Sequence, residues 1–223
     1  MPPLRLALFD CDGTLVDSQH HIVESMGLAF QSHGRPAPDP AAVRGIIGLS
    51  LHDALMRLLP DPDGDVDSLV NSYKESYRSL RLARAEPDPL YDGILEVLDH
   101  LEGEGWLLGV ATGKSMRGLL AVLEAHDLRQ RFTTLQTADG HPGKPHPSMI
   151  DVALAESGVE REQAVMIGDT SYDMLMARNA RVPGIGVAWG YHPVPDLQEA
   201  GARHMAEHPR DLIALTPRAL EAA

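Results

Sequence analysis

The chain has 223 residues and a formal net charge of −13, from 32 acidic and 19 basic side chains. This length suits one domain, or one domain with a smaller insert, and so acidic a chain disfavours binding to nucleic-acid phosphates. The single cysteine, Cys11, excludes a disulfide within the chain and a zinc cluster built on cysteines. No run of about 18 uncharged apolar residues exists, and residues 1–5 lack the pattern of a secretion signal, so we expect a cytoplasmic protein without a membrane span.

The first third of the chain predicts one strand followed only by helices. Residues 4–9 form a short apolar run before a glycine-containing loop, as buried strands do. From residue 18 to about 33 the apolar positions follow a helical period. The side chains on that face are Ile22, Met26, Ala29 and Phe30. Further helical segments are expected at residues 41–47, 51–59 and 66–82, and no strand pattern appears between residues 17 and 84.

After residue 86 strands and helices alternate. Strands are expected at residues 106–111, 132–136, 164–167 and 183–187. Helices are expected at residues 93–103, 115–126, 147–157 and 172–179. Repeated strand–helix–strand order implies a parallel sheet covered on both faces, which is a doubly wound α/β fold.

The simplest organisation is one α/β core domain with an inserted helical domain. The core would comprise residues 1–17 and 85–223, and the all-helical cap would comprise residues 18–84. Because the insert follows the first strand, both of its connections lie at the carboxyl end of that strand, where open parallel sheets bind ligands. A domain inserted there can cover the site as a lid.

The first chemical motif is the run from Asp10 to Thr14, directly after the first strand. If the chain leaves extended geometry at Gly13, Asp10 and Asp12 can both face one site. One carboxylate could attack phosphorus and the other could act as general acid and base. The alternative is a loop in which aspartate and glycine simply favour a turn.

Two further motifs could hold an anion. Thr112 and Gly113 follow the strand at residues 106–111, where a hydroxyl and free backbone N–H groups form an anion pocket; Thr112 could instead only cap the next helix. Lys144 lies between Gly143 and Pro145, with another proline at position 147, on a loop that these residues stiffen. A lysine held there is a preorganised cation for a phosphoryl oxygen, and the alternative is a solvated surface lysine.

The fourth motif contains Asp169 and Asp173, after the strand at residues 164–167. Four residues apart at a helix start, their side chains point the same way. Their hard oxygens suit Mg²⁺, whereas the alternative is an aspartate that only caps the helix. All four motifs follow predicted strands, so one pocket would gather a nucleophile, an acid/base, metal carboxylates, a hydroxyl and a lysine, which phosphoryl transfer requires.

These four motifs, in this order, resemble the signature motifs of the haloacid dehalogenase superfamily over essentially the whole chain. The helical insert resembles the C1 cap of subfamily I, and the phosphoglycolate phosphatase-like group is the most similar. The resemblance implies a magnesium-dependent phosphatase acting on a small phosphorylated metabolite, such as a 2-phosphoglycolate-like acid or a sugar phosphate.

Site roles follow from the resemblance, residue by residue. Asp10 would be the nucleophile that forms an aspartyl-phosphate and would also bind Mg²⁺. Asp12 would be the acid/base, with its backbone carbonyl on the metal. Thr112 and Gly113 would bind the phosphoryl group through a hydroxyl and an amide. Lys144 would steady both Asp10 and the phosphoryl group. Asp169 would bind the metal directly, and Asp173 would reach it through water or orient Lys144.

Alternatives to a phosphatase remain open. The dehalogenases of this superfamily lack an acid where this chain has Asp12. A phosphonatase would need a lysine early in the cap, whereas Lys74 lies in the last cap helix. A β-phosphoglucomutase-like enzyme would carry an arginine where this chain has Leu51. A non-catalytic binding protein of the same fold is a further alternative, and oligomeric state, monomer or homodimer, is not specified by the sequence.

Residues outside the motifs have weaker functional interpretations. Arg44 and His52 are polar candidates for substrate contact in the cap, although both could be surface side chains. His20 and His21 lie at the cap connection, where solvent exposure is expected. Cys11 is expected to point into the core as a small apolar side chain.

Overall fold

The computed structural model describes residues 3–59, 66–84 and 86–221. Six strands form one sheet in the spatial order β3-β2-β1-β4-β5-β6, and every neighbouring pair is parallel. The strands are β1 (Arg5–Phe9), β2 (Trp106–Thr112), β3 (Phe132–Thr137), β4 (Ala164–Gly168), β5 (Gly184–Val187) and β6 (His204–Ala206). The predicted doubly wound α/β fold is confirmed.

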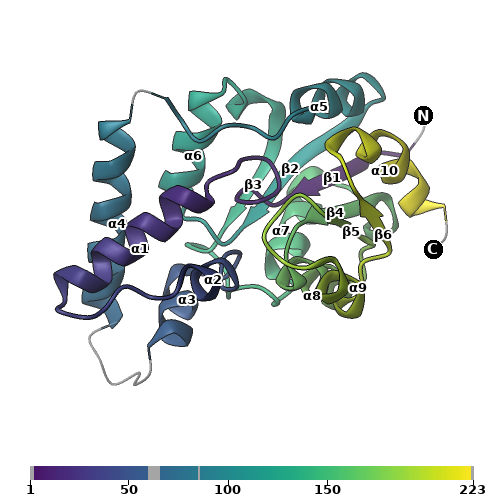
Figure 1. The fold of residues 1–223 in the computed structure, drawn as a ribbon. Coiled ribbons are helices and arrows are strands. Elements are labelled where there is room, and N and C mark those ends of the chain that lie inside the picture. The colour runs from purple at the N-terminus through teal and green to yellow at the C-terminus, as the bar shows by residue number, and fades with distance from the viewer. Residues whose placement is uncertain (1–2, 60–65, 85, 222–223) are drawn as a thin grey trace.

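Helices cover both faces of this sheet (Figure 1). In β1 the side chains of Ala7 and Phe9 pack with helices on one face, and those of Leu6 and Leu8 pack with helices on the other. The first face is covered by α5 (Ile94–Gly103), α6 (Met116–Ala125) and α10 (Leu212–Leu220). The second face is covered by α7 (Ser148–Ser157) and α8 (Ser171–Ala180). Because β1 is buried on both faces, its sequence is an apolar run and not an alternating one.

Four helices between β1 and α5 pack around an apolar cluster of their own. They are α1 (Gln19–Ser32), α2 (Pro40–Arg44), α3 (Leu51–Leu58) and α4 (Val66–Ala83). The four apolar side chains predicted for one face of the first helix are all buried in this cluster. Figure 1 shows the helices gathered to one side of the sheet, beside the end of β1. The predicted boundary at residue 85 lies outside the described residues, and the two-domain division stays a prediction.

No helix or strand was predicted beyond residue 187, where the structure adds α9 (Val194–Ala200), β6 and α10. Strand β6 has three residues, too few to show a period, and α10 contains Pro217, which weakens a helical pattern. Three short 3₁₀ turns, η1 (Arg129–Arg131), η2 (Arg161–Gln163) and η3 (Pro209–Asp211), complete the elements. Among the helices described, none combines the length and apolar character needed to cross a membrane.

Candidate active site

The four predicted motifs all lie at the carboxyl edge of the sheet. Asp10 follows β1, Thr112 ends β2 and Asp169 follows β4. Gly13 turns the chain with φ of +88°, and a Cβ on it would lie 2.2 Å from Asp169 Oδ2. Only glycine fits such a turn. The chain therefore leaves extended geometry at Gly13, as expected, and the first motif contacts the fourth.

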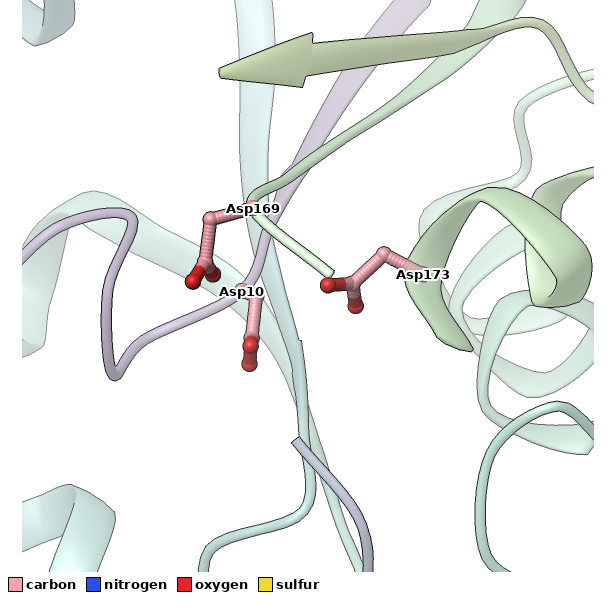
Figure 2. A group of neighbouring side chains, drawn as sticks. All are labelled: Asp10, Asp169 and Asp173. Atoms are coloured by element: carbon pink, nitrogen blue, oxygen red, sulfur yellow. The ribbon is translucent and has the colours of Figure 1, made fainter. Parts of the chain in front are cut away.

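Three buried carboxylates, those of Asp10, Asp169 and Asp173, meet at this edge (Figure 2). One oxygen from each lies within 4.8 Å of the others. Such a group of hard anionic oxygens fits Mg²⁺, which takes few protein ligands and retains waters. The arrangement brings together the three side-chain carboxylates that the sequence predicted for the metal.

Neighbouring groups fix the orientation of the Asp169 and Asp173 carboxylates. Asp169 Oδ1 accepts a hydrogen bond from Thr14 Oγ1 at 2.9 Å, and its Oδ2 accepts one from the backbone N–H of Tyr191 at 3.0 Å. Asp173 Oδ2 accepts from the hydroxyl and the N–H of Thr170, at 2.6 and 3.1 Å. Asp173 thus caps α8 as well, and its Oδ1 faces the site, so the capping interpretation and the metal interpretation are compatible.

Asp10 is the most exceptional of these carboxylates. Both of its oxygens are buried, and neither makes a hydrogen bond of good geometry with a described residue. Burial raises the pKa of Asp10 to about 6, against the opposing charge of Lys144. Burial and the charge of Asp10 likewise raise the pKa of Asp169 well above its usual range. Buried carboxylates left short of partners are costly, and a divalent cation would compensate them.

Lys144 is buried against two of these carboxylates. Its Nζ lies 3.0 Å from Asp10 Oδ1 and donates a hydrogen bond of 2.6 Å to Asp173 Oδ1. Although burial acts to lower the pKa of Lys144, the charges of Asp10 and Asp173 raise it, so the side chain is an ammonium. A solvated surface position, the alternative for Lys144, is wrong because the residue is only 3% exposed.

Asp12 is not part of the three-carboxylate group and has partners of its own. Both of its oxygens accept hydrogen bonds from Lys114 Nζ, at 2.7 and 2.8 Å, and Oδ1 also accepts one of 2.6 Å from Ser18 Oγ. The charge of Asp12 keeps the pKa of Lys114 well above its usual range, even though burial acts in the opposite direction. The two aspartates of the first motif thus have different partners, as two different roles would require.

The anion motif after β2 lies directly beneath the cap. Ser115 caps α6, so the helix-capping alternative for Thr112 is wrong. A Cβ on Gly113 would lie 2.3 Å from the backbone oxygen of Leu49 and 2.6 Å from that of Gly48. The cap loop that contains these two residues therefore rests on the backbone of Gly113, and the sequence needs glycine there for this close approach.

A cavity of about 1060 Å³ lies between the cap helices and the sheet edge. Its floor includes Asp10, Asp12 and Thr112. Cationic side chains from α4 and α6 also line it: Lys74, Arg78, Arg81 and Arg117. His52 lines this cavity, whereas Arg44 does not, so only one of the two candidate cap contacts faces it.

Comparison with known proteins identifies the family. A model of haloacid dehalogenase-like hydrolases matches residues 7–187 of the chain. The chain belongs to the haloacid dehalogenase-like hydrolase family. The "Probable phosphatase IndB" of Dickeya dadantii is 38% identical over 199 residues, which cover 87% of this chain and 86% of that protein.

Other relatives of this hydrolase agree with that assignment. A phosphoglycolate phosphatase of Agrobacterium fabrum is 30% identical over 88% of this chain and 86% of its own length. The crystal structure of a predicted phosphatase from Clostridium acetobutylicum superposes with a TM-score of 0.87 at 24% identity, covering 97% of this chain and all of that one, which supports the fold. The predicted family and the predicted enzyme class, a hydrolase of the phosphatase type, are confirmed.

One prediction at the cap connection of this hydrolase is wrong. His21 is 1% exposed, whereas exposure was expected, and only its neighbour His20 is exposed. The His21 ring stacks on Tyr77 at 4.1 Å between centroids and contacts Asp88. Its partners are 56 and 67 residues away, so no local pattern could indicate burial. Cys11 is buried in the apolar core, as expected.

Sequence reasoning missed several side chains that contact the predicted site residues. No role was predicted for Lys114, Ser18, Tyr77 or Tyr191. Lys114 carried the one available signal: it is one of the chain's three lysines and follows Thr112 and Gly113 directly. Tyr77 and Tyr191 lie far along the chain from the groups that they contact, whereas Ser18 is six residues from Asp12.

Proposed function

We propose that this phosphatase hydrolyses a small phosphomonoester with Mg²⁺, through an aspartyl-phosphate on Asp10. The observation that supports this most is Asp10 itself. Its two buried carboxylate oxygens make no hydrogen bond of good geometry with a described residue, and they lie beside an ammonium and two further carboxylates. An oxygen with few hydrogen bonds is a better nucleophile, and the neighbouring groups suit the charges of a phosphoryl group and a metal.

The reaction uses the two aspartates of the first motif in turn. An Asp10 oxygen forms a bond to phosphorus while the bond from phosphorus to the leaving oxygen breaks, and Asp12 gives its proton to that oxygen. Asp12 then takes a proton from water, the water oxygen bonds to phosphorus, and the bond to Asp10 breaks. Inorganic phosphate and the free alcohol are the products, and both aspartates return to their initial states.

Other site residues position and neutralise the phosphoryl group. The Thr112 hydroxyl and the Gly113 N–H bind its oxygens, and Lys144 neutralises charge beside Asp10. Asp10, Asp169 and Asp173, with the backbone carbonyl of Asp12, would hold Mg²⁺. The ion, when bound, neutralises charge on the transferred phosphoryl group.

The substrate proposed is a small phosphorylated metabolite, either a 2-phosphoglycolate-like acid or a sugar phosphate. Cations lining the cavity suit an anion, although the whole chain is strongly acidic. A cytoplasmic location and a monomeric or dimeric state stay predictions from the sequence.

The test is phosphate release from p-nitrophenyl phosphate and from sugar phosphates, with and without Mg²⁺. We expect turnover that requires Mg²⁺ and that Asp10→Asn abolishes. A matched control is Asp127→Asn, the same change at an exposed residue whose φ of 56° asparagine tolerates. Full activity of Asp10→Asn would exclude the mechanism. Movement of phosphate within a sugar, without phosphate release, would identify a mutase instead.

A further inference from the structure

Lys114 is a buried cation that the proposed reaction does not yet use. It follows Thr112 and Gly113 at the end of β2, and its side chain is 9% exposed. Its Nζ donates to both oxygens of Asp12, at 2.7 and 2.8 Å. Charge-assisted bonds of this kind are short and directional. A cation from the loop after β2 therefore holds the side chain that would carry the proton in catalysis.

A side chain of the cap also contacts the Lys114 ammonium. Lys114 Nζ lies 5.1 Å from the centroid of the Tyr77 ring and 3.5 Å from its hydroxyl oxygen. Tyr77 belongs to α4, and its ring stacks in turn on His21 of α1. Cation–π contact with this half-buried ring adds to the fixation of the ammonium. Lys114 thus lies between a core carboxylate and a cap ring.

The two buried lysines of the site serve different carboxylates. Lys144 contacts Asp10 and Asp173, the nucleophile and a member of the three-carboxylate group. The recorded ion pair of Lys114 is with Asp12, which lies outside that group. This division separates charge neutralisation at the phosphoryl group from control of the acid/base.

Hydrogen bonding also distinguishes the two oxygens of Asp12. Oδ1 accepts from both Lys114 and Ser18, whereas among the described residues Oδ2 accepts from Lys114 alone. A carboxylate oxygen has two lone pairs, so Oδ2 keeps one for a proton.

We propose that Lys114 is a positioning residue that fixes the Asp12 carboxylate so that Oδ2 transfers the proton. In the first step Oδ2 loses its proton to the leaving oxygen as the phosphorus–oxygen bond breaks. In the second step Oδ2 takes a proton from the attacking water. In both steps the Lys114 ammonium holds the plane of the carboxylate, and it stabilises the charged form after the proton has left. This role rests on the proposed function.

The experiment compares leaving groups, because Asp12 matters most where the leaving oxygen needs a proton. An alkyl phosphate needs one, whereas p-nitrophenolate departs without it. For Lys114→Met we expect kcat/KM to fall about 10–100-fold with the alkyl ester and less than about 3-fold with p-nitrophenyl phosphate. Because water attack still needs Asp12, the variant should also release p-nitrophenol in a burst of one equivalent per site before slow turnover. Lys114→Arg, which keeps the charge, should restore part of the alkyl activity.

Control measurements separate the possible failures. Arg178→Met removes a positive charge at an exposed site outside the cavity lining. It should leave kcat/KM unchanged for both the alkyl ester and p-nitrophenyl phosphate. Equal losses on the two esters, or a change in KM alone, would overturn the positioning role. A variant that does not fold would show in its thermal transition, and Lys114→Arg would then provide the same comparison. If the wild-type protein hydrolyses no ester with Mg²⁺, the proposed function itself has failed.

Discussion

At the scale of single residues, the site carries charge that its own fold does not balance. Asp10 and Asp169 are buried, and burial raises the pKa of each carboxyl group above its ordinary value. A carboxyl with a raised folded-state pKa binds its proton more tightly in the folded protein than in the unfolded chain. The contribution of Asp10 to stability therefore falls as the pH rises from below 3.8 to above about 6.

Replacing this acid should stabilise the protein while removing its activity. We expect metal-free Asp10→Asn to be more stable than the wild type by about 1–3 kcal/mol at pH 8, because the amide has no charge to bury. The gain should shrink at pH 5, where the wild-type carboxyl is largely protonated. Urea unfolding in a chelator at both pH values measures it. A variant less stable than the wild type at pH 8 would contradict this account of the site.

Magnesium should supply the missing positive charge. At a concentration of about 100 times Kd, a ligand that binds only the folded state adds about 2.7 kcal/mol. For a chain of this size that corresponds to a rise in Tm of about 5–10 °C. Asp169→Asn should lose most of this shift, and the wild-type shift should decline as the pH falls through about 6, where Asp10 gains a proton. An undiminished shift in Asp169→Asn would place the metal elsewhere.

At the scale of elements, the contact of the cap loop with the end of β2 decides how the site is covered. The backbone oxygens of Gly48 and Leu49 leave no room for a side chain on Gly113. A Cβ on Gly48 would lie 3.0 Å from the side chain of Thr170, which caps α8. One cap loop therefore touches two of the four motifs.

A methyl group at position 113 should separate the loop from the sheet edge. For Gly113→Ala we expect a fall in kcat/KM of about 10–100-fold, because misplaced positioning groups cost that much. Far-UV circular dichroism should show an unchanged fold. Gly140→Ala is the matched control, since a Cβ there meets nothing within 4 Å. Wild-type kinetics in Gly113→Ala would show that this contact does not matter for turnover.

At the scale of the whole molecule, the size of the cavity bears on the choice of substrate. Its volume of about 1060 Å³ is at the upper end of the range of ligand pockets, which is roughly 300–1,000 Å³. A leaving group as small as glycolate would leave most of it unfilled. Contacts with remote parts of a larger substrate can stabilise the transition state.

Sugar phosphates should therefore be better substrates than 2-phosphoglycolate. We expect kcat/KM to differ by about tenfold or more, since even one well-placed apolar contact is worth about 10-fold. Initial rates over a panel of esters at fixed Mg²⁺ measure the ratio. A preference for 2-phosphoglycolate would mean that the cap closes further onto the site when substrate is bound.

The sequence by itself determined the α/β fold, the helical character of residues 19–32, 51–58 and 66–83, and the residues that meet at the sheet edge. It could do so because each motif follows an apolar strand, and parallel strands bring their carboxyl ends to one edge. The three clustered carboxylates, Thr112 and Lys144 were all predicted from that rule.

Only the tertiary structure decided what surrounds those residues. Three contacts join segments that are far apart in the chain. Lys114 donates to Asp12, His21 is buried against Tyr77, and Gly113 packs closely under the cap loop. A local pattern reports the faces and ends of single elements. Contacts between elements depend on how the helices pack onto the sheet, and this packing gives Asp12 its partners.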